Sequence, residues 1–169
     1  MEMSRKKFVD LERDITVTSQ YNRWENLVID GIPDWVPQED LEGICLDLVY
    51  QLGFKDVGYY EVVGCHRLKK RRNDVTIPVI IRFINRKIPE FCKKKQWKLK
   101  KMNFNNWNIS LRDDLCEAND AILTECMKLR NDGRLFKVFT YNGFVKIVKK
   151  HGDQAMRLSH ISDVHALFS

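Results

Sequence analysis

Apolar residues recur along the chain at two characteristic spacings, and these spacings divide it into a series of helices and strands. In the first twenty residues Phe8, Leu11, Ile15 and Thr18 follow one another at intervals of three, four and three, between charged positions. This short heptad-like seam predicts a helix over residues 1–22. Two interpretations remain open: a single docked helix, or the remnant of a longer coiled coil in which Phe8, Leu11 and Ile15 mediate oligomerisation.

The pattern from residue 26 to residue 112 alternates between strand and helix periods. Strands are predicted at 26–33, 57–68, 76–85 and 109–111, where apolar residues occur at every second position. Helical spacing covers 37–52, which ends at Gly53, and resumes after Asn85, a suitable N-cap, to about residue 101. The resulting order β-α-β-β-α-β is typical of the ferredoxin-like plan, which includes RNA-recognition modules.

The last 57 residues predict a small α+β subdomain. Asp114 and Glu117 have the spacing of a capping box for a helix that ends near Gly133, with Leu115, Ala118, Ile122, Cys126 and Leu129 on its core face. Asn142-Gly143 then joins two extended runs as a hairpin turn, and a strand near 156–161 and a helical turn from Ser162 complete the chain. We therefore expect an α+β protein with an N-terminal helix (1–22), an RNA-recognition-like module (23–112) and a C-terminal domain (113–169).

The charge is distributed unevenly along the chain. Residues 1–61 carry 6 Lys and Arg against 13 Asp and Glu, whereas residues 62–169 carry 23 against 10. A basic stretch of this length favours a polyanionic partner, nucleic acid before membrane. The N-terminus has no secretory signal and no apolar run is long enough to span a membrane, so we expect an intracellular, cytoplasmic protein.

No arrangement of residues indicates catalysis, a cofactor or a metal. The five cysteines are odd in number and lack a CxxC pair, which predicts reduced and mostly buried thiols. Cys65 and His66 are adjacent on a predicted strand, so their side chains point to opposite faces and cannot readily share one ion. The adjacent carboxylates Asp113 and Asp114 stand where a helix cap is needed. We therefore expect no enzyme activity.

The run from Lys69 to Arg72 occupies the predicted turn between the second and third strands, where long cations can reach a phosphate backbone. Val28 and Ile80 occupy the positions at which an RNA-recognition module offers stacking rings, so base stacking on this sheet should be weak. Two alternatives stay open for the basic residues: a solvated surface for the lysines of 93–101, and a nuclear-import signal for the basic run, which would add a nuclear location.

The hairpin at Asn142-Gly143 predicts a face of rings and lysines. In a two-residue turn Tyr141 pairs with Phe144, Phe139 with Lys146 and Lys137 with Val148, all on one face. The opposite face carries Phe136, Val138, Thr140, Val145 and Ile147, which suffice for a core. The outer face would suit stacking of single-stranded bases. In the alternative, Phe139 and Phe144 are packed inside the protein.

Several motifs together resemble a known family. The segments YNRWENLVIDGIP, CHRL, IPVIIRFINRK, ISLRDDLCEAND and FTYNGFVKIV, in this order, resemble the RNA-binding part of LINE-type retrotransposon first-open-reading-frame proteins. The C-terminal part is more similar to the baculovirus few-polyhedra (FP) protein and its relatives in animal transposable elements. The resemblance implies a trimer formed by a coiled coil, and an RNA-recognition module and C-terminal domain that clasp single-stranded RNA as a nucleic-acid chaperone. It places Arg23 at the junction, and Arg130 and Arg134 at the end of the C-terminal-domain helix.

The sequence thus predicts a non-enzymatic protein that binds single-stranded nucleic acid, RNA first and single-stranded DNA second, without cofactor, membrane or small-molecule substrate. The alternative function is a protein–protein assembly module that self-associates through its N-terminal helix. The candidate nucleic-acid contacts are Arg23, Arg67, Lys69, Lys70, Arg71, Arg72, Arg82, Arg86, Lys87, Lys94, Lys98, Lys101, Arg130, Arg134, Lys137, Phe139, Tyr141 and Lys146.

Overall fold

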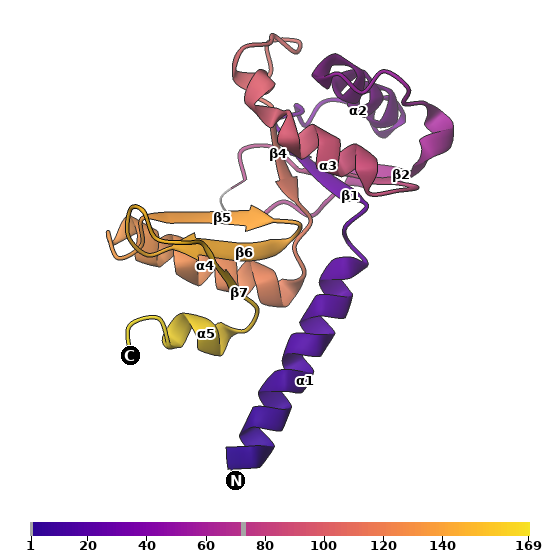
Figure 1. Ribbon diagram of the computed structural model, residues 1–169. Helices are drawn as coiled ribbons and strands as arrows, with labels where there is room; N and C mark the ends of the chain where they lie inside the picture. Colours follow the sequence, from indigo (N-terminus) through magenta and orange to yellow (C-terminus); the bar gives the residue numbers. More distant parts are fainter. Residues whose placement is uncertain (1, 72–73) are drawn as a thin grey trace. The chain divides into compact units, whose positions relative to one another are not determined.

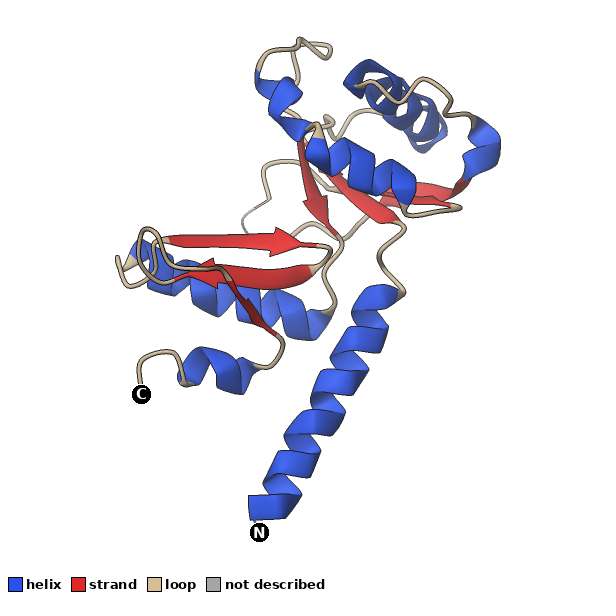
Figure 2. Ribbon diagram, in the orientation of Figure 1, coloured by secondary structure: helices blue, strands red, loops and turns tan. Residues whose placement is uncertain are grey.

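The computed structural model describes residues 2–71 and 74–169, and the chain divides into two compact units (Figure 1). One unit is continuous and spans residues 24–114. The other is discontinuous: residues 1–23, which contain helix α1 (Glu2–Tyr21), group with residues 115–169. Each unit combines helices with an antiparallel sheet, as Figure 2 shows, which confirms the predicted α+β class.

The unit of residues 24–114 has the predicted β-α-β-β-α-β order. It contains β1 (Asn26–Asp30), α2 (Gln38–Leu52), β2 (Val62–Arg67), β3 (Val79–Phe83), α3 (Lys87–Lys94) and β4 (Ser110–Asp113), with 3-10 turns η1 (Tyr59–Glu61) and η2 (Gln96–Lys100). The sheet is antiparallel in the order β2-β3-β1-β4, so the two central strands are the first and third in sequence. This is the ferredoxin-like arrangement expected from the sequence.

One face of this sheet is the core. Leu27, Ile29, Ile81 and Phe83 are inaccessible to solvent and pack in one cluster with the apolar sides of α2 and α3. Because side chains alternate between the two faces along each strand, Val28, Ile80 and Arg112 lie on the other face, where they are neighbours in register.

Several predicted elements of this unit are shorter than expected, among them the strands predicted at 26–33 and 76–85, which span Asn26–Asp30 and Val79–Phe83. The helix predicted after Asn85 ends at Lys94, and its continuation tightens into η2, where Lys98 N–H donates to Lys95 O and Lys101 N–H to Lys98 O. The second strand begins only at Val62, because Tyr59–Glu61 form a 3-10 turn and the ladder shifts register between Val62 and Gly64. The N-cap of α3 is Arg86 rather than the predicted Asn85, but Asn85 Oδ1 still accepts from the backbone N–H of Lys87, the first residue of the helix, at 2.9 Å.

The discontinuous unit stacks a three-stranded sheet on a helix. Helix α4 (Glu117–Asn131) packs against β5 (Lys137–Tyr141), β6 (Phe144–Val148) and β7 (Met156–Leu158), and α5 (Ile161–His165) follows. The strands are antiparallel in the order β5-β6-β7. Its core lies between α4 and the sheet and contains Ile122, Cys126, Leu135, Val138, Val145, Ile147, Leu158, Val164 and Leu167.

Helix α1 is attached to this unit by polar contacts at two levels. Near its end, the buried Gln20 accepts hydrogen bonds through Oε1 from Cys116 N–H at 2.9 Å and from Asn119 Nδ2 at 3.1 Å. In its middle, Arg13 donates two 2.6 Å hydrogen bonds to the carboxylate of Asp163. The N-terminal helix thus has the C-terminal residues as its partner.

The start of α4 differs from the prediction. The residue before the helix is Cys116, whose side chain makes no capping bond, so the capping box of Asp114 and Glu117 was wrong. Asp114 instead accepts from Asn26 Nδ2 at 2.9 Å. On the predicted core face Ile122 and Cys126 are buried and Leu129 packs against the core, whereas Ala118 is exposed and the neighbouring Asn119 is buried instead. The backbone N–H of Cys116 at the start of the helix is satisfied by Gln20 Oε1 instead of by a side chain of the predicted capping box.

Candidate nucleic-acid interface

The outer face of the β5-β6-β7 sheet is a ladder of rings and cations. The strand register pairs Tyr141 with Phe144, Phe139 with Lys146 and Lys137 with Val148, which confirms the predicted pairing. Lys146 is in turn opposite Arg157 on β7. We call Lys137, Phe139, Tyr141, Phe144, Lys146 and Arg157 the aromatic ladder.

The rings of the ladder lie outside the core. None of Phe139, Tyr141 and Phe144 belongs to the cluster under the sheet, which is filled by Val138, Val145 and Ile147 from the opposite parity. Tyr141 is 56% exposed, and Phe139 and Phe144 are half-buried among their strand neighbours. The predicted inner face was wrong at one residue: Phe136 precedes β5, is exposed, and sets its ring against His151 with centroids 5.1 Å apart.

Each ring of the ladder has a cation above it. Lys137 Nζ lies 4.9 Å from the centre of the Phe139 ring and Lys146 Nζ lies 5.1 Å from that of Tyr141. The Arg157 guanidinium lies 3.5 Å from the centre of the Phe144 ring, and burial lowers its pKa. Such pairs place positive charge beside a stacking surface, which is the combination that single-stranded nucleic acids use.

The turn below the ladder is held in place by the helices. Asn142 and Gly143 both have positive φ, 51° and 81°, as the tight hairpin turn requires. Asn119 Nδ2 donates to Gly143 O at 2.9 Å, and a Cβ on Gly143 would meet the Gln20 side chain at 2.2 Å. Glycine is therefore required here by conformation and by close approach together. The register of the ladder is fixed by this turn.

Arg157 and Phe144 were absent from the predicted contacts, and Phe144 was considered only as a strand partner of Tyr141 or as a packed ring. Alternation could have found Arg157, because the buried Leu158 at the next position places it on the outer parity of β7. That inference needed the pairing of β7 with β6, which no turn signal in the sequence specifies.

The outer face of the other sheet has no Phe, Tyr or Trp ring in its central row. His66, Ile80, Val28 and Arg112 follow one another across β2, β3, β1 and β4. Val28 is only 1% exposed, and Arg112 is held by Asp30, with Nε 2.8 Å from Oδ2. The candidate contact Arg82 also lies on this face, in an ion pair of 3.1 Å with Glu25. Apart from the imidazole of the exposed His66, this face carries charged and aliphatic side chains rather than stacking rings.

The basic run is located where the sequence placed it, between β2 and β3. Lys69, Lys70 and Arg71 are exposed, and Lys70 Nζ approaches Asp34 at 3.6 Å. Arg71 N–H donates to Asp74 Oδ2 at 2.8 Å, which turns the loop back toward β3. Arg72 lies outside the described residues. The backbone N–H of Ile77 donates to Asp34 at 2.7 Å and lowers the pKa of that carboxyl, so Asp34 is charged beside Lys70.

Arg67 lies on the inner parity of β2, opposite Val79. Its guanidinium donates to the backbone carbonyls of Ile77 at 2.8 Å and Ile32 at 3.2 Å, and to that of Pro33. The geometry gives this side chain a role in joining segments of its own unit.

The remaining candidate cations belong to both units, and several of them contact rings of their own unit. Arg86 stacks on Trp24 at 4.3 Å, and Arg134 on Phe168 at 4.2 Å. Lys98 and Lys101 each lie 5.8 Å from the centre of the exposed Trp97 ring, and Lys98 also donates to Leu52 O. Lys87, Lys94 and Arg130 are exposed on helices α3 and α4, and Arg23 is half-buried.

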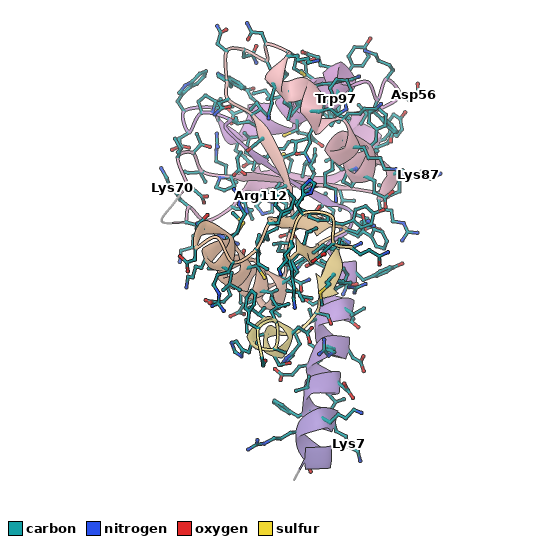
Figure 3. The ribbon with its side chains drawn as sticks, turned by 60° about the vertical axis from the view of Figure 1, so that its left-hand side comes forward. Lys7, Asp56, Lys70, Lys87, Trp97 and Arg112 are labelled. Carbon is teal, nitrogen blue, oxygen red and sulfur yellow. The ribbon has the colours of Figure 1, made fainter. Side chains whose placement is uncertain are left out.

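Within the unit of residues 24–114 these cations occupy distinct sides. Helices α2 and α3 cover the inner face of the sheet, so the lysines around Trp97 are on the helical side and Arg82 is on the other. Figure 3 shows Lys70 and Lys87 at opposite ends of this unit. The predicted lysine surface and the predicted sheet surface are therefore separate.

Cys65 and His66 point to opposite faces, as predicted: Cys65 packs against the core and His66 is exposed. In the described part of the chain no three His, Cys, Asp or Glu side chains are grouped so as to hold a metal. Among the same residues, no helix combines the length and apolar character needed to cross a membrane.

Comparison with known proteins adds little to this geometry. No protein-family model matches the chain, and no curated protein matches its sequence. A similar solved structure is the NMR structure of the RRM3 domain of Hrb1, which is 13% identical and covers 54% of this chain and 77% of that chain at a TM-score of 0.34. The strand order β2-β3-β1-β4, and not this likeness, is the ground for the fold.

Proposed function

We propose that the chain binds single-stranded nucleic acid, RNA first, with its aromatic ladder as the base-stacking surface. The observation that supports this most strongly is that three rings and three cations share the outer face of a sheet whose core is complete without them. Stacking on a ring tolerates any base, and the cations attract phosphates. The ladder therefore suits an extended strand with little sequence preference.

Phosphate contacts from the loop between β2 and β3 supplement the ladder in this proposal. Lys69, Lys70 and Arg71 are exposed at the end of their unit, where long side chains can follow a flexible backbone. Arg82 and Arg112 supply further charge on the outer face of the same unit. The lysines around Trp97 and the guanidinium of Arg67 are left out of the proposed surface.

The test is a titration of fluorescent single-stranded and double-stranded RNA and DNA at several salt concentrations. Because stacking on one ring contributes about 1–3 kcal/mol, Tyr141→Ala should weaken single-strand binding roughly tenfold with an unchanged salt slope. Lys146→Ala should lower the slope of log affinity against log salt by about one.

Matched controls exist on the same unit. Phe136→Ala removes an exposed ring outside the ladder, and Lys150→Ala removes an exposed lysine beyond β6. If Phe136→Ala weakened binding as much as Tyr141→Ala, the ladder would have no special role. A second variant, with alanine at Lys69, Lys70, Arg71 and Arg72, tests the loop: unchanged affinity and slope would remove it from the surface.

The motif order in the sequence supports a finer assignment to the LINE-type first-open-reading-frame proteins, with a C-terminal unit of the FP type. On this assignment the chain is a ribonucleoprotein component and nucleic-acid chaperone of a transposable or virus-like element. An annealing assay with complementary oligonucleotides tests the chaperone part: binding without any acceleration of annealing would contradict it.

A second candidate function is protein–protein assembly through α1. Phe8, Leu11 and Ile15 are 64%, 60% and 68% exposed on one side of this helix, which is more apolar surface than a solvated helix needs. Light scattering of the intact chain and of the variant Leu11→Gln, Ile15→Gln tests self-association without altering the core. An oligomer lost in this variant, together with no affinity for any nucleic acid at low salt, would favour assembly over the first proposal.

A further inference from the structure

Two cysteines from different elements meet behind strand β2. Cys45 on α2 is inaccessible to solvent, and Cys65 on β2 packs against the same core but is partly exposed. Their Sγ atoms are 3.9 Å apart. Because the sulfurs of a disulfide are about 2.05 Å apart, its formation would bring these two about 2 Å closer.

We propose that Cys45 and Cys65 form a reversible dithiol–disulfide site that covalently joins α2 to β2 under oxidising conditions. This site is independent of the proposed nucleic-acid function. Its oxidant is a small disulfide such as oxidised glutathione.

The reaction consists of two exchanges. The Cys65 thiolate attacks one sulfur of oxidised glutathione, forms a mixed disulfide, and releases the first glutathione as a thiolate, which takes up the proton that Cys65 lost. Cys45 then gives up its proton and its sulfur attacks Sγ of Cys65, which breaks the mixed disulfide and releases the second glutathione. Two protein thiols are thus oxidised while one oxidised glutathione is reduced to two thiols.

The local electrostatics favour Cys65 as the attacking residue. A hydrogen bond from the Cys45 thiol lowers the pKa of Cys65, whereas the same bond together with burial raises the pKa of Cys45 well above its ordinary range. The partly exposed sulfur is therefore the more nucleophilic one, and the buried sulfur is placed to resolve the mixed disulfide.

Oxidation would act on an edge strand of the sheet. In the order β2-β3-β1-β4, β2 is an edge strand with β3 as its one hydrogen-bonded neighbour, and its ladder shifts register between Val62 and Gly64. A bond from Cys65 to α2 would tie this edge to the helix layer. It would also fix the strand from which the basic loop at Lys69 emerges.

The other three cysteines serve as internal controls. Burial raises the pKa of Cys92 to about 12 and that of Cys126 to about 11, and Cys116 is buried at the start of α4. We expect them to remain reduced under conditions in which Cys45 and Cys65 react.

The experiment incubates the intact chain in glutathione buffers of graded oxidised-to-reduced ratio, followed by acid quench, alkylation and peptide mass mapping. The expected product has lost two hydrogens, contains one cross-linked peptide pair holding Cys45 and Cys65, and reverts on reduction. Its thermal midpoint should exceed that of the reduced chain by roughly 5 °C or more, because the cross-link restricts the unfolded chain.

Single-cysteine variants distinguish the roles of the two sulfurs. Cys45→Ala should accumulate the mixed disulfide of Cys65 with glutathione, whereas Cys65→Ser should leave Cys45 unmodified. The wild-type mapping does not depend on how well either variant folds. The proposal would be overturned if wild-type Cys65 stopped at the mixed disulfide, if a different cysteine pair formed, or if the folded chain stayed fully reduced where free cysteine is oxidised.

Discussion

The guanidinium of Arg67 is surrounded by backbone carbonyls of its own unit. It donates to Ile32 and Pro33, which follow β1, and to Ile77, which precedes β3. A charged donor is well suited to this position, because several carbonyls of a chain reversal can be satisfied by one side chain. Arg67 therefore stabilises the base of the basic loop.

Replacement of Arg67 should lower the stability of the fold and leave the salt dependence of nucleic-acid binding unchanged. Because hydrogen bonds from a charged donor contribute about 1.5–3 kcal/mol each and are not additive, Arg67→Ala should reduce the free energy of unfolding by about 2–4 kcal/mol in urea titrations. Lys69→Ala, at an exposed loop position, should change it by no more than about 0.5 kcal/mol. If the Arg67→Ala protein were as stable as wild type and its slope of log affinity against log salt were lower by one, Arg67 would instead be a phosphate contact.

At the scale of elements, α1 depends on an ion pair for part of its attachment. Asp163 accepts two guanidinium hydrogen bonds from Arg13, which donates a third to Ser159 Oγ, and further bonds from the backbone N–H groups of Ser159 and His160. The bond from Arg13 is the main cause that lowers the pKa of Asp163 to about 2. Burial opposes this shift without cancelling it.

The lowered pKa fixes the direction of a pH dependence. The carboxylate stabilises the fold fully above the pKa of an unfolded Asp, near 4, and this contribution disappears as the pH falls through about 2. Asp163→Asn should therefore lower the free energy of unfolding by about 1–2 kcal/mol at pH 7, and the gap to wild type should close toward pH 2. Asp153→Asn, at an exposed turn residue, is the control. A gap that persisted undiminished at pH 2 would contradict an electrostatic origin.

The elements also show which parts of the fold a sequence can disclose. The β5–β6 hairpin and its ladder were predictable, because Asn142-Gly143 fixes the register locally and alternation then sorts rings from core. The cap of α4 was not predictable, because its acceptor is Gln20, 96 residues away from Cys116. The contact between Cys45 and Cys65 similarly depends on how α2 packs on the sheet, and no spacing in the sequence encodes it.

At the scale of the whole molecule, the net charges of the two compact units differ from those of the acidic and basic parts of the sequence. The first 61 residues are acidic and the remainder basic, yet the compact units are balanced: residues 24–114 carry 16 Lys and Arg against 13 Asp and Glu, and the discontinuous unit carries 13 against 10. Each unit is thus net +3, so neither alone is the basic half that the sequence suggested. Binding should rely on locally placed cations and rings.

This balance leads to a prediction for isolated units. The fragment of residues 24–114 has its own core and should unfold cooperatively, but it lacks the aromatic ladder. Because two linked contacts reinforce each other by effective concentration, we expect this fragment to bind single-stranded RNA at least about 100-fold more weakly than the whole chain. Anisotropy titrations at equal salt would test this expectation. Equal affinities would place the binding surface wholly within residues 24–114.

The discontinuous unit has a consequence for biosynthesis. β1 and β4 are neighbours, with Leu27 opposite Asp113, so the two ends of the unit that interrupts it lie side by side. During translation the N-terminal helix leaves the ribosome before the residues that hold Gln20 and Arg13 have been made. The interrupting unit can complete its sheet first. Until synthesis reaches Asp163, the nascent chain displays a helix with an exposed apolar seam and without its docking partner, and this is the stage at which a chaperone would be most useful.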